Sequence, residues 1–154
     1  MKVQNEMNIS FESRSSNEGF ARCAVSAFIT QLDPTISELN DIKTAVSEAV
    51  TNCVVHAYRN TIGKIYINVK IKENFVVVIK VRDTGCGIED IKQAMQPLFT
   101  TAPSEERAGL GFAVMQSFMD KLKVTSKVNC GTTVTMEKYI IRRNSKAVND
   151  DCNS

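Results

Sequence analysis

The alternation of apolar and polar side chains is clearest in the middle of the chain. Apolar residues occupy every second position from Ile65 to Ile71, which predicts a half-buried strand. Glu73-Asn74 predicts a tight turn, and the dense apolar run over 75–81 predicts a returning strand at the centre of the sheet, buried on both faces. Three more strands are predicted at 3–11, 124–128 and 132–141, the last two as a hairpin.

Apolar residues at helical spacing predict three longer helices. The first follows Ser15 and Glu18, which stand at the spacing of a capping box. Its apolar face is predicted to consist of Phe20, Ala24, Ala27 and Phe28. A short helix is predicted around 89–95 and a third long helix over 112–122.

The second long helix has stronger start signals. Pro34 precedes Thr35-x-x-Glu38, which is another capping box. Its predicted apolar face consists of Leu39, Ile42, Val46, Ala49 and Cys53.

The order of these elements points to one fold class. The helices and the antiparallel strands segregate into two layers. This predicts a two-layer α/β sandwich of the α+β class, with helices on one face of the sheet. A doubly wound Rossmann topology fits poorly because the strands do not alternate with helices. A single domain over 1–141 is expected in a chain of 154 residues, and the polar segment 142–154 is predicted to be a disordered tail.

The charge balance narrows the class of partner. Nineteen basic and seventeen acidic residues leave a net charge of +2, without the basic run that a nucleic-acid binder usually shows. A protein or a small molecule is therefore the expected partner. The first residues lack the apolar stretch of a signal peptide, and no apolar run is long enough to cross a bilayer, so we expect a soluble, cytoplasmic protein without a membrane partner.

Five scattered cysteines form no CxxC pair, which indicates free thiols in a reducing compartment. His56 is the only histidine, which argues against zinc. Cys23 and Cys53 stand at core spacing and are predicted to be packing residues.

The second helix carries the first candidate site. Glu48 and Asn52 are four residues apart and share one helix face, and His56 continues the stripe by another turn. A carboxylate, an amide oxygen and an imidazole in a row could hold a hydrated metal ion and activate a hydroxyl. The alternative from the residues alone is an ordinary solvated helix face.

The turn after the central strand carries the second candidate site. Asp83 ends the strand, and Gly85 and Gly87 permit a sharp turn that a flat ligand can approach closely. The carboxylate could accept a hydrogen bond from an exocyclic amine such as that of adenine. The spacing matches neither a dinucleotide-binding fingerprint nor a P-loop, and a plain strand-to-helix turn is the alternative.

The third candidate is the start of the last long helix. Backbone N–H groups at Gly109-Leu110-Gly111-Phe112 would suit phosphate, because the amides of a helix N-terminus are unpaired. The irregular segment before it, which contains Thr101 and Arg107, has the length of a lid. The fourth, Gly131-Thr132-Thr133, is by itself a hairpin turn.

The order and spacing of these four motifs resemble the N, G1, G2 and G3 boxes of the GHKL ATPases. Within that superfamily, four segments resemble the anti-sigma F factors of spore-forming bacteria. They are residues 17–22, 47–52, 96–101 and 117–120. The resemblance covers residues 5 to about 140 and implies a mixed, mainly antiparallel sheet.

The resemblance implies roles for individual residues in binding ATP and Mg²⁺. Asn52 would bind the metal, and Glu48 would be the general base for a serine hydroxyl. Asp83 would bind the adenine amine with Thr133 beside it, in a pocket shaped by Gly85 and Gly87. Arg107 would be the catalytic cation or, alternatively, a contact to the partner protein. The remaining nucleotide-binding residues would be His56, Thr101, Gly109, Leu110, Gly111 and Phe112.

The resemblance also implies partners. The family binds sigma factor F, phosphorylates a serine of a small anti-anti-sigma protein, and acts as a homodimer, with Arg22 and Glu18 at the partner contact. Three alternatives differ in chemistry or partner. They are the anti-sigma kinase of the general stress response, an ATP-gated binding module without kinase activity, and a detached histidine-kinase catalytic domain.

Overall fold

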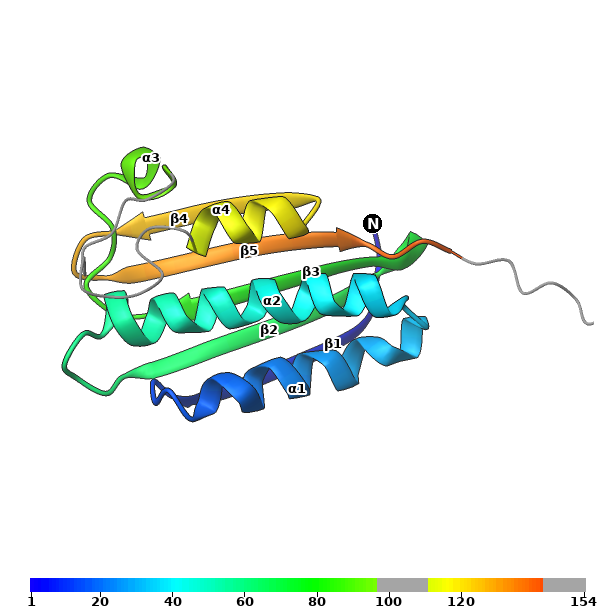
Figure 1. The fold of residues 1–154 in the computed structure, drawn as a ribbon, viewed down its shortest axis with the longest axis horizontal. Coiled ribbons are helices and arrows are strands. Elements are labelled where there is room, and N and C mark those ends of the chain that lie inside the picture. Colours follow the sequence, from blue (N-terminus) through cyan, green and yellow to red (C-terminus); the bar gives the residue numbers. More distant parts are fainter. Residues whose placement is uncertain (97–110, 143–154) are drawn as a thin grey trace, which may run out of the picture.

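The protein has two layers, a five-stranded sheet and three helices that lie across one of its faces (Figure 1). The computed structural model describes residues 1–96 and 111–142. The strands are β1 (Val3–Glu12), β2 (Lys64–Lys72), β3 (Val76–Asp83), β4 (Lys121–Lys127) and β5 (Gly131–Tyr139). The helices are α1 (Asn17–Ile29), α2 (Ile36–Asn52), α3 (Ile91–Ala94) and α4 (Gly111–Phe118).

The sheet has the strand order β1-β2-β3-β5-β4, so the predicted central strand, β3, does lie at its centre. All four pairings among the described strands are antiparallel, and a parallel component, expected from a mixed sheet, is not found there. The predicted α+β class with helices on one face is confirmed.

One face of every strand is apolar and packs beneath the helices. Cross-strand register aligns Ile67 with Val81, and Val81 with Val134, so apolar side chains form continuous rows across the sheet. The opposite face carries mainly polar and basic side chains. Only the first half of β3 is buried on both faces, because Lys80 and Arg82 are exposed.

The predicted capping box at the start of α2 is confirmed. The Thr35 hydroxyl accepts from the Glu38 N–H, and the Glu38 carboxylate accepts from the Thr35 N–H. The predicted apolar face of α2 is buried in the core, with Leu39 packed at its margin. A π-helical turn over Cys53–Ala57 continues the helix.

The predictions for α1 were partly wrong. Its start at Asn17 has no side-chain cap, so Ser15 and Glu18 form no capping box. The buried face is formed by Ala21, Val25 and Ile29, one position later than predicted, while Phe20 is 53% exposed and packs edge-on against Phe11. Both faces follow helical spacing, and packing against α2 and the sheet decides between them.

The third long helix is shorter than predicted. It ends at Phe118, and the chain enters β4 at Lys121, where Leu122 pairs with Met136. Cys53 is buried as predicted, but Cys23 is exposed and is not a packing residue. The tail expected at 142–154 lies, after its first residue, outside the described residues. Among the helices described, none is long and apolar enough to cross a membrane.

Candidate functional site

Three contacts bring the four predicted motifs together around the end of α2. A Cβ on Gly111 would lie 2.9 Å from Asn52 Oδ1, so the start of α4 abuts the end of α2. Cys53, which follows Asn52, has its Sγ 3.6 Å from Asp83 Oδ2. A Cβ on Gly131 would lie 2.1 Å from the Asp83 carbonyl oxygen. Residues from four distant parts of the sequence therefore meet at one place.

Asp83 is the best-defined member of this site. It is 5% exposed and stands at the end of β3. Its Oδ1 accepts from the N–H groups of Gly85 at 2.9 Å and Thr132 at 3.2 Å, while Oδ2 accepts from the Cys53 thiol. A carboxylate has about four acceptor sites, so one more donor can bind.

Burial is the main influence on the titration of this pair. It raises the pKa of Asp83, although the Gly85, Cys53 and Thr132 hydrogen bonds and the Arg82 charge oppose the change. Burial, and then the charge of Asp83, also raise the pKa of the Cys53 thiol. The thiol therefore stays protonated and remains a hydrogen-bond donor to the carboxylate.

The glycine turn after Asp83 is packed tightly against two other segments. A Cβ on Gly85 would lie 2.3 Å from the Ala57 carbonyl oxygen, and the Cys86 N–H donates to that oxygen at 3.0 Å. Gly87 has a φ of +74° and abuts the Lys127 carbonyl. These glycines thus hold the turn between the π-helical turn and the β4–β5 hairpin, which fixes the surroundings of the carboxylate.

Tyr58 also holds this turn in place. Its hydroxyl accepts from the Thr84 N–H at 2.8 Å and donates to the Lys64 carbonyl. The ring is buried. Because Thr84 follows Asp83 directly and Lys64 begins β2, Tyr58 connects the end of β3 to the start of β2.

At the end of α2, the polar stripe is not a solvated helix face. Glu48 is 6% exposed and Asn52 is half-buried. His56 is also half-buried but lies in the π-helical turn, so α-helical spacing from Asn52 does not apply to it. Its backbone carbonyl accepts from the Cys86 thiol at 3.3 Å. A buried carboxylate one turn from an amide is typical of a functional position more than of a surface.

The start of α4 supplies the remaining described part of the site. Gly111 is buried against Asn52, and Phe112 packs on the margin of the core. Backbone closeness to Asn52 explains the glycine at position 111, since any side chain there would displace the amide. Four predicted site residues lie outside the described residues: Thr101, Arg107, Gly109 and Leu110.

One site prediction was wrong in register. Thr133 pairs with Arg82 and lies on the sheet face opposite the helices, in a shallow hollow with Tyr66 and Lys80. Thr132 stands beside Asp83 instead, with its hydroxyl bonded to Ser126 at 2.7 Å. Strand alternation from Val134 could have identified Thr132, because it shares the buried face.

The two predicted partner residues lie on α1 and touch each other. Arg22 Nη1 is 3.4 Å from Glu18 Oε1, and the Arg22 side chain is 43% exposed. The Ser47 hydroxyl of α2 donates to the same Glu18 oxygen. Glu18 thus connects an exposed guanidinium to the residue that precedes Glu48.

The arrangement is suited to an adenine nucleotide with a hydrated cation. Asp83 has an acceptor position for an amine, and Asn52 offers an amide oxygen beside a helix start. Within residues 1–96 and 111–142, no three His, Cys, Asp or Glu side chains form a metal cluster. Mg²⁺ commonly takes few protein ligands together with phosphate and water, so a single amide oxygen fits a cation that arrives with nucleotide.

Comparison with known proteins defines the class. Residues 11–138 match the family model described as a histidine kinase-like ATPase domain. The fold resembles the RsbU and RsbW domains of a Mycobacterium tuberculosis protein, with a TM-score of 0.64 and 17% identity over 89% of this chain and 32% of that one. It also resembles a blue-light activated histidine kinase domain of Erythrobacter litoralis, with a TM-score of 0.53 and 19% identity over 80% of this chain and 61% of that one. The protein is thus a histidine kinase-like ATPase domain, and ATP is the nucleotide of its class.

Sequence relatives define the family within that class. The chain is 59% identical to an anti-sigma F factor of Caldanaerobacter subterraneus over 92% of its own length and 99% of the relative. It is 50% identical to an anti-sigma F factor of Priestia megaterium over 95% of its length and 99% of that relative. The chain belongs to the anti-sigma F factor family.

Proposed function

We propose that this protein binds and inhibits a sigma factor of the F type and, with Mg²⁺ and ATP, phosphorylates a serine of an anti-anti-sigma protein. The observation that carries the proposal is the position of Glu48. This buried carboxylate lies one helical turn before Asn52, which contacts the start of α4. Regulation by nucleotide binding alone would need no base at this position.

Each end of the site has a distinct part in the proposed reaction. Asp83 accepts the adenine amine at the position that its three existing bonds leave, and so orients the base. Asn52 holds the cation, whose charge offsets that of the phosphates. Glu48 accepts the proton of the attacking serine hydroxyl. Arg107, Thr101, Gly109 and Leu110 remain predicted phosphate-end residues from the family resemblance.

The partner surface is proposed on α1. The Arg22 guanidinium is part exposed and its orientation is set by Glu18. It can therefore donate to an acidic or carbonyl group of a partner without first ordering a free side chain. A homodimer stays a prediction that rests on the family, and a cytoplasmic location stays a prediction that rests on the sequence.

Phosphoryl transfer tests the proposal. The purified protein is incubated with Mg²⁺ and γ-labelled ATP, with and without the anti-anti-sigma protein of the same organism. Label should appear on a partner serine, and Glu48→Gln should lower the rate by roughly 10²–10⁴ while ATP still binds, since this is the usual contribution of a general base.

Two other results would redirect the proposal. Tight ATP binding and an ATP-dependent sigma complex without transfer would leave an ATP-gated binding module and remove the role of Glu48. Transfer to a stress-response antagonist in preference to the sporulation antagonist would assign the protein to the general stress response.

A further inference from the structure

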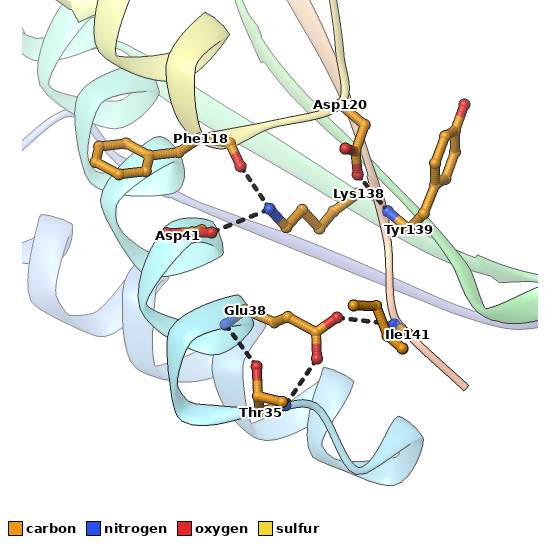
Figure 2. A network of polar contacts seen from close by, with 8 residues as sticks. All are labelled: Thr35, Glu38, Asp41, Phe118, Asp120, Lys138, Tyr139 and Ile141. Carbon is orange, nitrogen blue, oxygen red and sulfur yellow. Dashed lines mark hydrogen bonds and ion pairs between the residues drawn. The ribbon is translucent and has the colours of Figure 1, made fainter. Parts of the chain in front are cut away.

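Far from the candidate site, one lysine holds three elements together. Lys138 Nζ lies 3.0 Å from Asp41 Oδ2 of α2 and donates to the carbonyl of Phe118, the last residue of α4, at 2.8 Å. Figure 2 shows the amine between these two groups. Lys138 itself belongs to β5 and faces the helix layer, between the buried Met136 and Ile140.

This contact is partly protected from water. The Lys138 side chain is 13% exposed and that of Asp41 is 26% exposed. The amine complements the partial negative charge at the end of α4, and its bond to the carbonyl is charge-assisted. We therefore expect it to restrain α4 more strongly than a surface ion pair would.

Neighbouring bonds fix the same end of the molecule. The Glu38 carboxylate accepts from the Ile141 N–H at 2.8 Å, and the Asp120 carboxylate accepts from the Tyr139 N–H at 2.7 Å (Figure 2). The ends of β5, α2 and α4 are thus fixed to one another. Among the residues drawn in Figure 2, it is the Lys138 amine that contacts both helices.

The two helices touch again at their other ends, where the phosphates are proposed to bind. Asn52 is eleven residues beyond Asp41 in α2, or roughly 16 Å along its axis. Gly111 is seven residues before Phe118 in α4, or roughly 10 Å. A short, straight helix transmits an axial shift at one end to the other, so the position of Phe118 determines that of Gly111.

We propose that Lys138 is a positioning residue for the phosphate end of the nucleotide site. By holding Asp41 and the last carbonyl of α4, it fixes the axial position of α4 against α2, and with it the separation of Gly111 from Asn52. The inference rests on the proposed function of this site. It does not involve the base end, where Asp83 is held by the N–H groups of Gly85 and Thr132 and by the Cys53 thiol.

Lys138→Met tests the inference because it keeps the apolar stem and removes the amine. The dissociation constants of ATP and adenosine are measured at a temperature at which all variants are folded. ATP affinity should fall by roughly three- to thirtyfold, the range for changes that act through a packed network, and adenosine affinity by less than about twofold. Lys138→Arg should restore most of the ATP affinity.

Lys121→Met is the matched control. The Lys121 amine lies 3.9 Å from the Glu137 carboxylate on the exposed sheet face, so this ion pair joins two strands and no helix. Its loss should leave both affinities unchanged. A second measurement is amide hydrogen exchange, which should become faster in α4 of Lys138→Met and stay unchanged in β1 and β2.

Several results would overturn the inference. They are unchanged ATP affinity in Lys138→Met, equal losses for ATP and adenosine, and unchanged exchange in α4. Absence of ATP binding by the unmodified protein would instead overturn the proposed function, and the inference with it.

Discussion

The base end and the phosphate end of the site are built differently. At the base end, Asp83 is bonded to two backbone N–H groups and a buried thiol, and the glycine turn around it abuts backbone on two sides. At the phosphate end, Asn52 and Gly111 are brought together by the ends of two helices.

The two ends differ in the contacts that determine their geometry. The Gly85 and Thr132 N–H groups and the Cys53 thiol hold the carboxylate locally, so a shift of α4 should leave it in place. The phosphate end depends on how α4 lies against α2, and therefore on contacts as distant as Lys138. Recognition of the base should be insensitive to such changes, while phosphate binding and transfer should respond to them.

Asn52→Ala should produce the largest difference between the effect at the phosphate end and the effect at the base end. Loss of the amide oxygen removes the proposed cation ligand and should lower phosphoryl transfer by roughly 10²–10³, as for other single charge-stabilising groups. Adenosine affinity should stay within about twofold, because Asp83 keeps its bonds. Asn68→Ala, on the far face of the sheet, is the control. Equal losses for ATP and adenosine would show that the two ends are not independent.

Asp83→Asn should affect both ligands alike. Binding of ATP and adenosine should each weaken by roughly 10- to 100-fold, the usual contribution of a hydrogen bond to a charged group. Isothermal titration of both ligands checks this expectation. A loss confined to ATP would place the base elsewhere.

The same variant should be more stable at neutral pH. Because burial raises the pKa of Asp83, its ionised form is disfavoured in the folded protein relative to the unfolded chain. The asparagine keeps an oxygen for the Gly85 and Thr132 N–H groups and carries no charge, so the free energy of unfolding should rise. The gain should disappear as the pH falls through the raised pKa, which urea denaturation at several pH values would detect.

The motif residues could be predicted from sequence because each meets a local requirement. Gly87 needs a positive φ, and Thr35 and Glu38 cap one helix. The alternation over β2 likewise fixes which of its side chains are buried, without reference to other elements.

Features that depend on strand register or on contacts between distant residues could not be predicted from the sequence. The sequence has two adjacent candidate threonines at the hairpin. The register of β5 against β3 places Thr132, not Thr133, beside Asp83. Cys53 and Tyr58 support the site through contacts across 30 and 26 residues of sequence, which no spacing rule reveals. Their position in the assembled fold, and not their residue type, makes them part of the site.

The smallest expected effect concerns the thiol at the base end. Its hydrogen bond lowers the pKa of Asp83, so Cys53→Ala should raise that pKa further. Asp83 must be ionised to bind the amine as proposed, and ATP affinity should therefore begin to fall at a higher pH on acidification than in the unmodified protein. At pH 7 the change should be less than about threefold, since a thiol is a weak donor. Cys53→Ser keeps a donor and should retain the original profile, as should Cys23→Ala at an exposed position. Identical profiles for all three variants would show that the thiol has no influence on the charge state of Asp83.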